Sequence, residues 1–304
     1  MAFNGPRLGN SSTEINAITF TKTGIDYLDG LYTGYKWDVP ADKVFEYSFI
    51  NSSSTFAANY STSNEPSALQ AIPDAFKLSV RDVLDVFEKY IDVTFTEVTE
   101  TASSNGTFRY GFTSSSIMGD TPAWAYGPSP IYWGQDHPSY PSGGDVWTNA
   151  DVDYADWTLV TPGTYEFSTI LHETGHALAL KHPHTAETND NSEYIWPNTD
   201  QTYNVLPVEL DSIANTVMSY RDYIGASTTG GYSSEKFSTT LMRLDVLALQ
   251  NLYGANTNTN LGNTTYQWSD NFVFETIFDN GGIDTITWAG NKLTRRTTSS
   301  STAR

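Results

Sequence analysis

The sequence predicts an α+β fold, with strands and helices arranged around one cleft. Three observations support this class. Short stretches rich in β-branched and aromatic residues recur through the first half of the chain. Three longer stretches place apolar side chains at helical spacing. The second of these helical stretches carries histidines at the spacing of a metal site, which predicts a metal ion in the cleft.

Composition limits the class of protein before any motif is considered. The chain has 304 residues, of which 38% are hydrophobic and 14% aromatic, so it can form a packed core. It has no cysteine, which excludes disulfides and a thiol nucleophile. Nucleic acid is not an expected partner, because the net charge is −19 and phosphate binding needs a basic face. No apolar run reaches the roughly 18 residues of a membrane span, so no membrane partner is expected.

The first half of the chain predicts most of the sheet and one helix. Residues 1–22 are polar and are expected to be loosely held. An alternating pattern predicts a strand over 44–50, and a Ser- and Asn-rich loop follows over 51–67. Apolar positions at helical spacing predict a helix over 75–91. Further strands are expected over 93–97, 107–112, 123–126 and 146–147.

The second half predicts two more helices and then a change of composition. A helix is expected over 164–180, with Phe167 and Ile170 on its apolar face. Another is expected over 240–253, where apolar residues again recur at helical spacing. From Gly254 onward Asn, Thr and Gly dominate, and helix-forming residues become rare.

The most informative motif lies on the helix expected over 164–180. Residues 172–176 read HETGH, and His182 follows six residues later. Imidazoles at i and i+4 lie on one face of a helix, so His172 and His176 can reach one metal ion. His182 can complete the set if the helix ends about one turn later and the chain bends back. Three neutral imidazoles with an open position are typical of a catalytic zinc site.

A lone motif of this kind also arises by chance on surface helices. Here the third histidine has the spacing of the long zinc motif, and residues 217–220 read VMSY, which fits the Met-containing turn expected below the metal. Glu173 lies beside the first ligand without being a ligand itself, where it can act as a general base. The sequence therefore predicts one catalytic zinc.

The chain resembles the serralysins, bacterial secreted zinc endopeptidases of the metzincin clan. The resemblance covers nearly the whole chain and implies a twisted, mostly parallel sheet with an antiparallel edge strand, an active-site helix and then the start of a calcium-binding β-roll. Besides the zinc motif, it is carried by residues 23–37, 144–147, 180–184 and 245–256.

The resemblance also implies a division of the chain. Residues 1–22 correspond to a propeptide-like segment, and residues 23–253 to the catalytic domain. Residues 254–304 correspond to a β-roll that is expected to be truncated, because the chain continues after one repeat into a basic, Ser- and Thr-rich tail.

Single residues take roles from the same resemblance. Glu173 would take a proton from water and return it to the leaving amine. Tyr220 would bind the zinc at rest and stabilise the oxyanion once substrate enters. Met218 would form a hydrophobic floor below the ion. The sheet edge expected to bind substrate consists of Ala123, Trp124, Ala125 and Tyr126.

One residue departs from the family pattern. The long motif has glycine three residues after the second histidine, where this chain has Ala179. The glycine lets the backbone turn with a positive φ towards the third ligand. Alanine can occupy the same conformation at a cost of roughly 1 kcal/mol, which is compatible with the family.

Two turns in the C-terminal segment are candidates for calcium. Residues 279–285 read DNGGIDT, which resembles one copy of a glycine- and aspartate-rich repeat, and a plain turn is the alternative. A roll of such repeats needs about three copies to be stable, so structural calcium is expected to be weakly bound and at few sites. The resemblance implies as calcium ligands Asn260, Gly262, Thr264, Asp279, Gly281, Gly282 and Asp284.

The leading hypothesis is a secreted zinc endopeptidase that hydrolyses peptide bonds of extracellular proteins. The resemblance implies protein or peptide substrates, a proteinaceous inhibitor as a further partner, a monomer, and export from the cell, although the family's C-terminal export signal is not seen in this chain. The alternative is a catalytically impaired or truncated relative that acts as a calcium-binding or adhesive module. The intact Glu173 and the histidine triad favour the enzyme.

Overall fold

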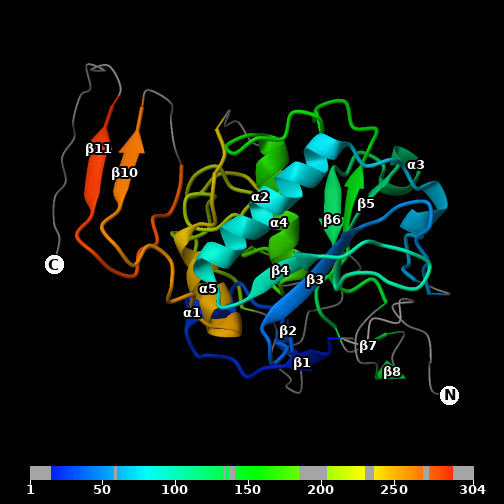
Figure 1. Cartoon of the computed structure of the whole chain (residues 1–304), viewed down its shortest axis with the longest axis horizontal. Helices are drawn as coiled ribbons and strands as arrows, with labels where there is room; N and C mark the ends of the chain where they lie inside the picture. Colours follow the sequence, from blue (N-terminus) through cyan, green and yellow to red (C-terminus); the bar gives the residue numbers. More distant parts are fainter. Residues whose placement is uncertain are drawn as a thin grey trace.

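A five-stranded sheet forms the centre of the molecule (Figure 1). The computed structural model describes residues 15–57, 60–129, 131–132, 135–136, 141–184, 204–229, 236–269 and 274–289. The order in the sheet is β4-β3-β5-β9-β6, and only β6 runs antiparallel to its neighbour. The expected mostly parallel sheet with an antiparallel edge strand is therefore confirmed. Its strands are β3 (Val44–Phe49), β4 (Thr94–Glu97), β5 (Phe108–Thr113), β6 (Ala123–Ala125) and β9 (Val146–Asn149).

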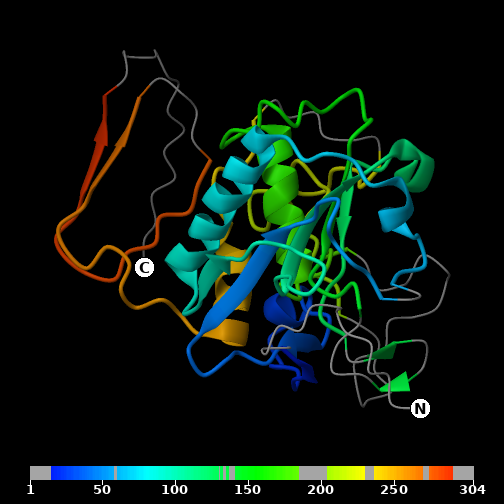
Figure 2. The ribbon, with the colours of Figure 1, turned by 45° about the vertical axis from the view of Figure 1, so that its right-hand side comes forward.

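Two long helices, α2 (Asp74–Tyr90) and α4 (Tyr165–Ala177), lie side by side against one face of this sheet (Figure 2). Each turns an apolar stripe inward, as the helical spacing predicts. In α2 the stripe includes Phe76, Val80 and Phe87, which are fully buried. All the predicted strands and both of these helices are present, with ends that differ by a few residues.

The third helix, α5 (Arg243–Tyr253), begins three residues later than predicted. Asp245 accepts a hydrogen bond from the Met242 backbone N–H at 2.9 Å, which fixes the start of the helix. Its buried side packs into the same core as α2 and α4. No described helix has the combination of length and apolar character that crossing a membrane requires.

The N-terminal segment differs from its prediction. Instead of being loosely held, residues 15–20 include β1 (Ala17–Thr19), which pairs antiparallel with β2 (Tyr35–Trp37), and Ile15 is buried. The expectation is therefore wrong for this part, while residues 1–14 lie outside the described residues. Between the two strands stands α1 (Asp26–Asp29). The fully buried Trp37 donates its indole N–H to the Ala177 carbonyl at 2.8 Å, so this segment supports the end of α4.

Several short elements occupy stretches that were predicted as loops or left unassigned. Apolar periodicity could not reveal them, because each is shorter than two helical turns or a typical strand. They are η1 (Glu65–Ala68), α3 (Ser115–Met118), β7 (Ile131–Tyr132) and β8 (Gln135–Asp136).

After α5 the chain leaves the core and forms a separate pair of parallel strands, at the side of the molecule in Figure 1. These are β10 (Thr265–Trp268) and β11 (Thr285–Trp288). The Tyr90 hydroxyl donates to the Thr276 carbonyl at 2.8 Å, which ties the connection between them to α2. In the described part of the chain the pair stands as a two-stranded sheet, so the β-roll stays a prediction.

Candidate metal centre

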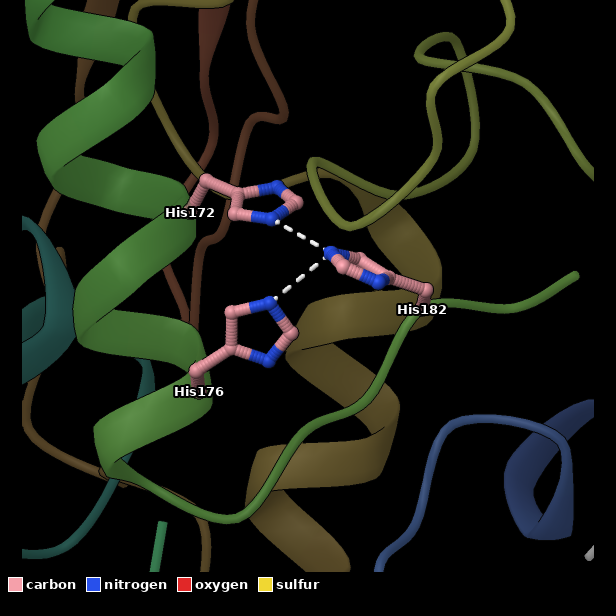
Figure 3. Close-up of side chains that lie close together, drawn as sticks. All are labelled: His172, His176 and His182. Carbon is pink, nitrogen blue, oxygen red and sulfur yellow. Dashed lines mark hydrogen bonds between the residues drawn. The ribbon is translucent and has the colours of Figure 1, made fainter. Parts of the chain in front are cut away.

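Three histidine side chains converge at the carboxyl end of α4 (Figure 3). His172 and His176 extend from the same face of the helix, and His182 approaches from the segment that follows it. The His182 Nε2 atom lies 3.0 Å from Nε2 of His172 and 2.9 Å from Nε2 of His176. Nitrogen ligands around a tetrahedral zinc with bonds of about 2.0–2.1 Å lie about 3.3 Å apart, so this donor set fits one zinc ion closely.

Backbone carbonyls fix the orientation of the two helical histidines. The His172 Nδ1 atom lies 2.8 Å from the Val217 carbonyl, and the His176 Nδ1 atom lies 2.8 Å from the Leu180 carbonyl. A carbonyl only accepts hydrogen bonds, so each Nδ1 carries the proton and each Nε2 offers a lone pair. Burial lowers the pKa of His172 to about 3 and that of His176 to about 4, so both rings are neutral at physiological pH.

The chain reaches the third histidine through a tight turn. The Leu180 N–H donates to the Gly175 carbonyl at 2.9 Å and closes the end of α4. Ala179 has φ of 83° in this turn, the left-handed conformation that the family's glycine would take. Beyond it, the Lys181 ammonium donates to the Gly30 carbonyl at 2.9 Å and to the His182 carbonyl at 3.1 Å. The chain therefore turns towards His182 with alanine in the left-handed conformation at this position.

Glu173 lies next to the histidines in an unusual environment for a carboxylate. It is 7% exposed, and its Oε2 atom has no hydrogen-bond partner among the described residues. Burial raises its pKa to about 8. A buried, unsatisfied carboxyl group costs folding free energy, and such groups concentrate at sites that transfer protons.

The Met-containing turn packs directly against the motif. A Cβ atom on Gly175 would lie 2.7 Å from the Met218 sulfur, so the glycine is needed for this contact. Met218 is fully buried, which agrees with a hydrophobic floor. From α5, Asp245 accepts hydrogen bonds from the Thr216 hydroxyl at 2.5 Å and from the Val217 N–H at 2.8 Å. Because the Val217 carbonyl contacts His172, the turn connects α5 to the first ligand.

Sequence reasoning missed Asp245 because it lies in the predicted apolar helix over 240–253. Its position in the first turn of that helix was the one available signal, since acidic residues are favoured there.

Tyr220 follows this turn and faces the triad. Its ring centroid lies 4.4 Å from that of His182 and 5.6 Å from that of His172. The ring is 39% exposed, and its pKa is raised mainly by burial. The structure thus brings Tyr220 next to the histidine triad, while its roles at the zinc and at the oxyanion stay predictions.

His184 also lies beside the triad, and its ring contacts those of His182 and Tyr220. Its ring stacks on that of His182 at 5.4 Å, with 6° between the planes, and lies 5.1 Å from that of Tyr220.

A cleft of about 610 Å³ opens beside the triad. His172, Glu173 and Tyr220 form one wall, and Tyr165 and Phe237 contribute aromatic surface. A larger groove of about 840 Å³ lies at the carboxyl ends of β3 and β4 and holds none of the histidines. The smaller cleft is therefore the candidate active site, because it is the one of these two that contains His172, Glu173 and Tyr220.

The predicted substrate-binding strand borders this cleft in part. Ala123 lines it, and β6 forms the edge of the sheet. The side chains of Trp124 and Tyr126 instead donate to the carboxylate of Glu65, which is fully buried; the Trp124 bond measures 2.8 Å. These two side chains hold the strand, and Ala125 lies between them. Glu65 lies in a stretch predicted as loop, where no sequence pattern indicated its role.

The seven candidate calcium ligands lie in two turns that touch. A Cβ atom on Gly282 would lie 2.4 Å from the Gly262 carbonyl oxygen, so the backbones are in direct contact. Asp284 accepts from the Thr264 N–H at 2.9 Å, and Asp279 accepts from the Gly281 N–H at 2.9 Å. In the described ranges, the one group of three or more histidines and carboxylates able to hold a metal is the histidine triad. Calcium binding by Asn260 and its neighbours therefore stays a prediction.

Comparison with known proteins identifies similar chains. No protein-family model matches the chain. Serralysin B of Dickeya chrysanthemi is 29% identical over 271 residues, which cover 82% of this chain and 50% of that protein. Serralysin C of the same organism is 31% identical over 238 residues, covering 72% and 44%. A serralysin of Photorhabdus laumondii is 29% identical over 278 residues, covering 84% and 52%. The chain spans about half the length of these curated relatives.

Proposed function

The chain belongs to the serralysin family, and on that basis we propose that it is a zinc-dependent endopeptidase that hydrolyses peptide bonds in proteins. The observation that carries the proposal is the position of Glu173. It is a buried carboxyl group whose Oε2 atom has no hydrogen-bond partner among the described residues, and it adjoins three histidines whose Nε2 atoms converge. A structural zinc site has four protein ligands and no use for such a carboxylate, whereas a catalytic site has three ligands and a nearby base.

Glu173 carries out both proton transfers of the proposed reaction. The chemistry that zinc supplies when bound is Lewis acidity, which makes water more acidic and a carbonyl more electrophilic. Glu173 takes a proton from the attacking water at its carboxylate and later gives it to the leaving amine. Burial raises the pKa of Glu173 to about 8, so a proton taken from the water is held until it passes to the leaving amine.

Tyr220 supplies a hydroxyl donor for the oxyanion that develops on the attacked carbonyl. Its ring already lies over His182, at 4.4 Å between centroids, and it remains 39% exposed on the cleft. Such a donor acts mostly on the transition state, because negative charge appears on the oxygen only there.

Substrate would bind as an extended strand beside β6. An edge strand presents unpaired backbone groups, and a peptide can add to it by main-chain hydrogen bonds. The Glu65 carboxylate accepts hydrogen bonds from the Trp124 and Tyr126 side chains, which anchors this strand. The proposal includes protein or peptide substrates, a proteinaceous inhibitor that would occupy the same cleft, a monomeric state and a place outside the cell.

The proposal is tested by zinc analysis of the purified chain combined with casein hydrolysis. We expect about one zinc per chain, and loss of hydrolysis in a chelator that removes zinc while calcium is kept in excess. Zinc added back in stoichiometric amount should restore activity, and calcium alone should not.

Two results would contradict the proposal. Zinc bound at full occupancy without hydrolysis of casein or unfolded protein would favour the binding or adhesive module. Hydrolysis that persists after complete removal of zinc would exclude the metal mechanism.

A further inference from the structure

The residues on both sides of Tyr220 share one partner, Asp211. The Ser219 hydroxyl donates to one carboxylate oxygen of Asp211 at 2.6 Å. The Arg221 Nε donates to the other oxygen at 2.8 Å. Asp211 is 3% exposed, so both bonds lie in a poorly solvated place where they are stronger than in water.

Further contacts on the same side restrict the segment. The Ile213 N–H donates to the Arg221 carbonyl at 2.8 Å, and the Arg221 guanidinium donates to the Ala226 carbonyl. The His184 Nδ1 atom lies 4.0 Å from the second oxygen of Asp211. The residues on both sides of Tyr220 are therefore held, while its ring stays partly exposed above the triad.

We propose that Asp211 is a positioning residue that keeps the Tyr220 phenol over the histidine triad by holding Ser219 and Arg221. The inference rests on the proposed function for the role of the phenol, but the placement of the ring is a separate property. Asp211 and Asp245 have different tasks in this view. Asp245 holds the start of the turn, at Thr216 and Val217, and Asp211 holds its end.

A spectroscopic experiment without substrate tests the placement. Imidazole triads bind Cu²⁺, and a phenolate bound to Cu²⁺ gives a charge-transfer absorption band in the visible range. The Cu²⁺-loaded full chain is expected to show this band, and Tyr220→Phe is expected to remove it. Asp211→Asn should bind one Cu²⁺ and lose most of the band. The matched control is Asp29→Asn, which changes an equally buried carboxylate that holds the turn at Thr23 and should leave the band unchanged.

Kinetics on the zinc-loaded protein provide a second readout. Asp211→Asn should lower kcat by up to about 10²-fold, the effect expected when a reacting group is displaced by about 1 Å, with little change in KM. In the Tyr220→Phe background the same substitution should cause no further fall, because the two residues would act through one hydroxyl.

The inference is overturned if wild type lacks the band, if Asp211→Asn keeps it at full intensity, or if kcat falls equally in both backgrounds. Should Asp211→Asn fail to fold, Arg221→Gln removes one of the two contacts, and a band of wild-type intensity in that variant would overturn the inference as well. An inactive wild type whose band is lost in Asp211→Asn would contradict the proposed function but support the placement by Asp211.

Discussion

The metal centre and the C-terminal strand pair are held together by opposite means. In the metal centre His172 and Glu173 are each 7% exposed, and their surroundings come from α4, α5 and the Met-containing turn. In the strand pair Ile283 and Ile286 are 82% and 71% exposed, and order comes from backbone pairing and from two turn carboxylates.

This difference indicates where each region is sensitive. The stability and geometry of a packed site change when single atoms are lost or gained, because close-packed neighbours cannot move far. A two-stranded sheet with little burial is marginally stable and tolerates side-chain changes that avoid its turns. We therefore expect substitutions around the triad to have large effects and equivalent ones around β10 and β11 to have small effects.

The largest effect is expected for Glu173→Gln. Casein hydrolysis should fall by at least ~10²–10⁴, because the substitution removes the general base. Zinc content and melting temperature should stay close to wild type, since Glu173 has no hydrogen-bonded partner among the described residues at Oε2. Glu166→Gln, in the first turn of the same helix, is the control and should remain active. Near-wild-type turnover in Glu173→Gln would refute the assigned base.

Tyr220→Phe should lower kcat by ~10²–10³ while zinc remains bound, because one oxyanion donor is lost. The measurement is a full kinetic comparison with Tyr223→Phe, which removes the hydroxyl of an exposed tyrosine nearby. A change confined to KM, or loss of zinc, would show that Tyr220 has a structural role instead.

Two glycine substitutions compare the regions directly. Gly175→Ala places a Cβ atom 2.7 Å from the Met218 sulfur, whereas Gly262→Ala meets nothing within 4 Å. Overpacking at position 175 should lower the free energy of unfolding by ~1–3 kcal/mol. The higher helix propensity of alanine offsets up to ~1 kcal/mol of this loss. Gly262→Ala should change the free energy of unfolding by less than ~0.5 kcal/mol. Chemical denaturation of both variants checks this, and equal effects would remove the contrast between the regions.

Ala179→Gly should be neutral or stabilising by less than ~1 kcal/mol. The positive φ of Ala179 is strained for alanine, and glycine would relieve that strain. The substitution also increases the conformational freedom of the unfolded chain, which offsets part of this gain in stability. Thermal melting and zinc titration are the measurements. A clear fall in melting temperature or zinc occupancy would mean that burial of the Ala179 methyl group outweighs the strain.

The smallest effect is expected from calcium. The described turns offer two carboxylates, Asp279 and Asp284, and both already accept hydrogen bonds from backbone N–H groups. Calorimetric titration should find Kd around 10⁻⁴–10⁻³ M, with weaker binding and therefore a higher Kd in Asp284→Asn, and with zinc content unaffected. Several sites of micromolar affinity would show that the strand pair is a stronger metal site than its exposure suggests.

Local spacing made the core of the site predictable from sequence. The positions of His172 and His176 follow from helix geometry, and the strands β3, β4 and β5 follow from alternation and β-forming residues. β1 and β2 were missed, because a three-residue strand carries too few positions to show a period and its pairing partner lies about 20 residues away.

By itself the sequence predicted the three converging histidines, the neighbouring Glu173 and the left-handed turn at Ala179, since each depends on spacing within about ten residues. Only the tertiary structure decided what holds them. Asp245 lies 28 residues from Val217, and Trp37 lies 140 residues from Ala177. Such contacts have no period and leave no local pattern. They form because burial forces each polar group to find a partner, and the folded chain determines which partner is within reach.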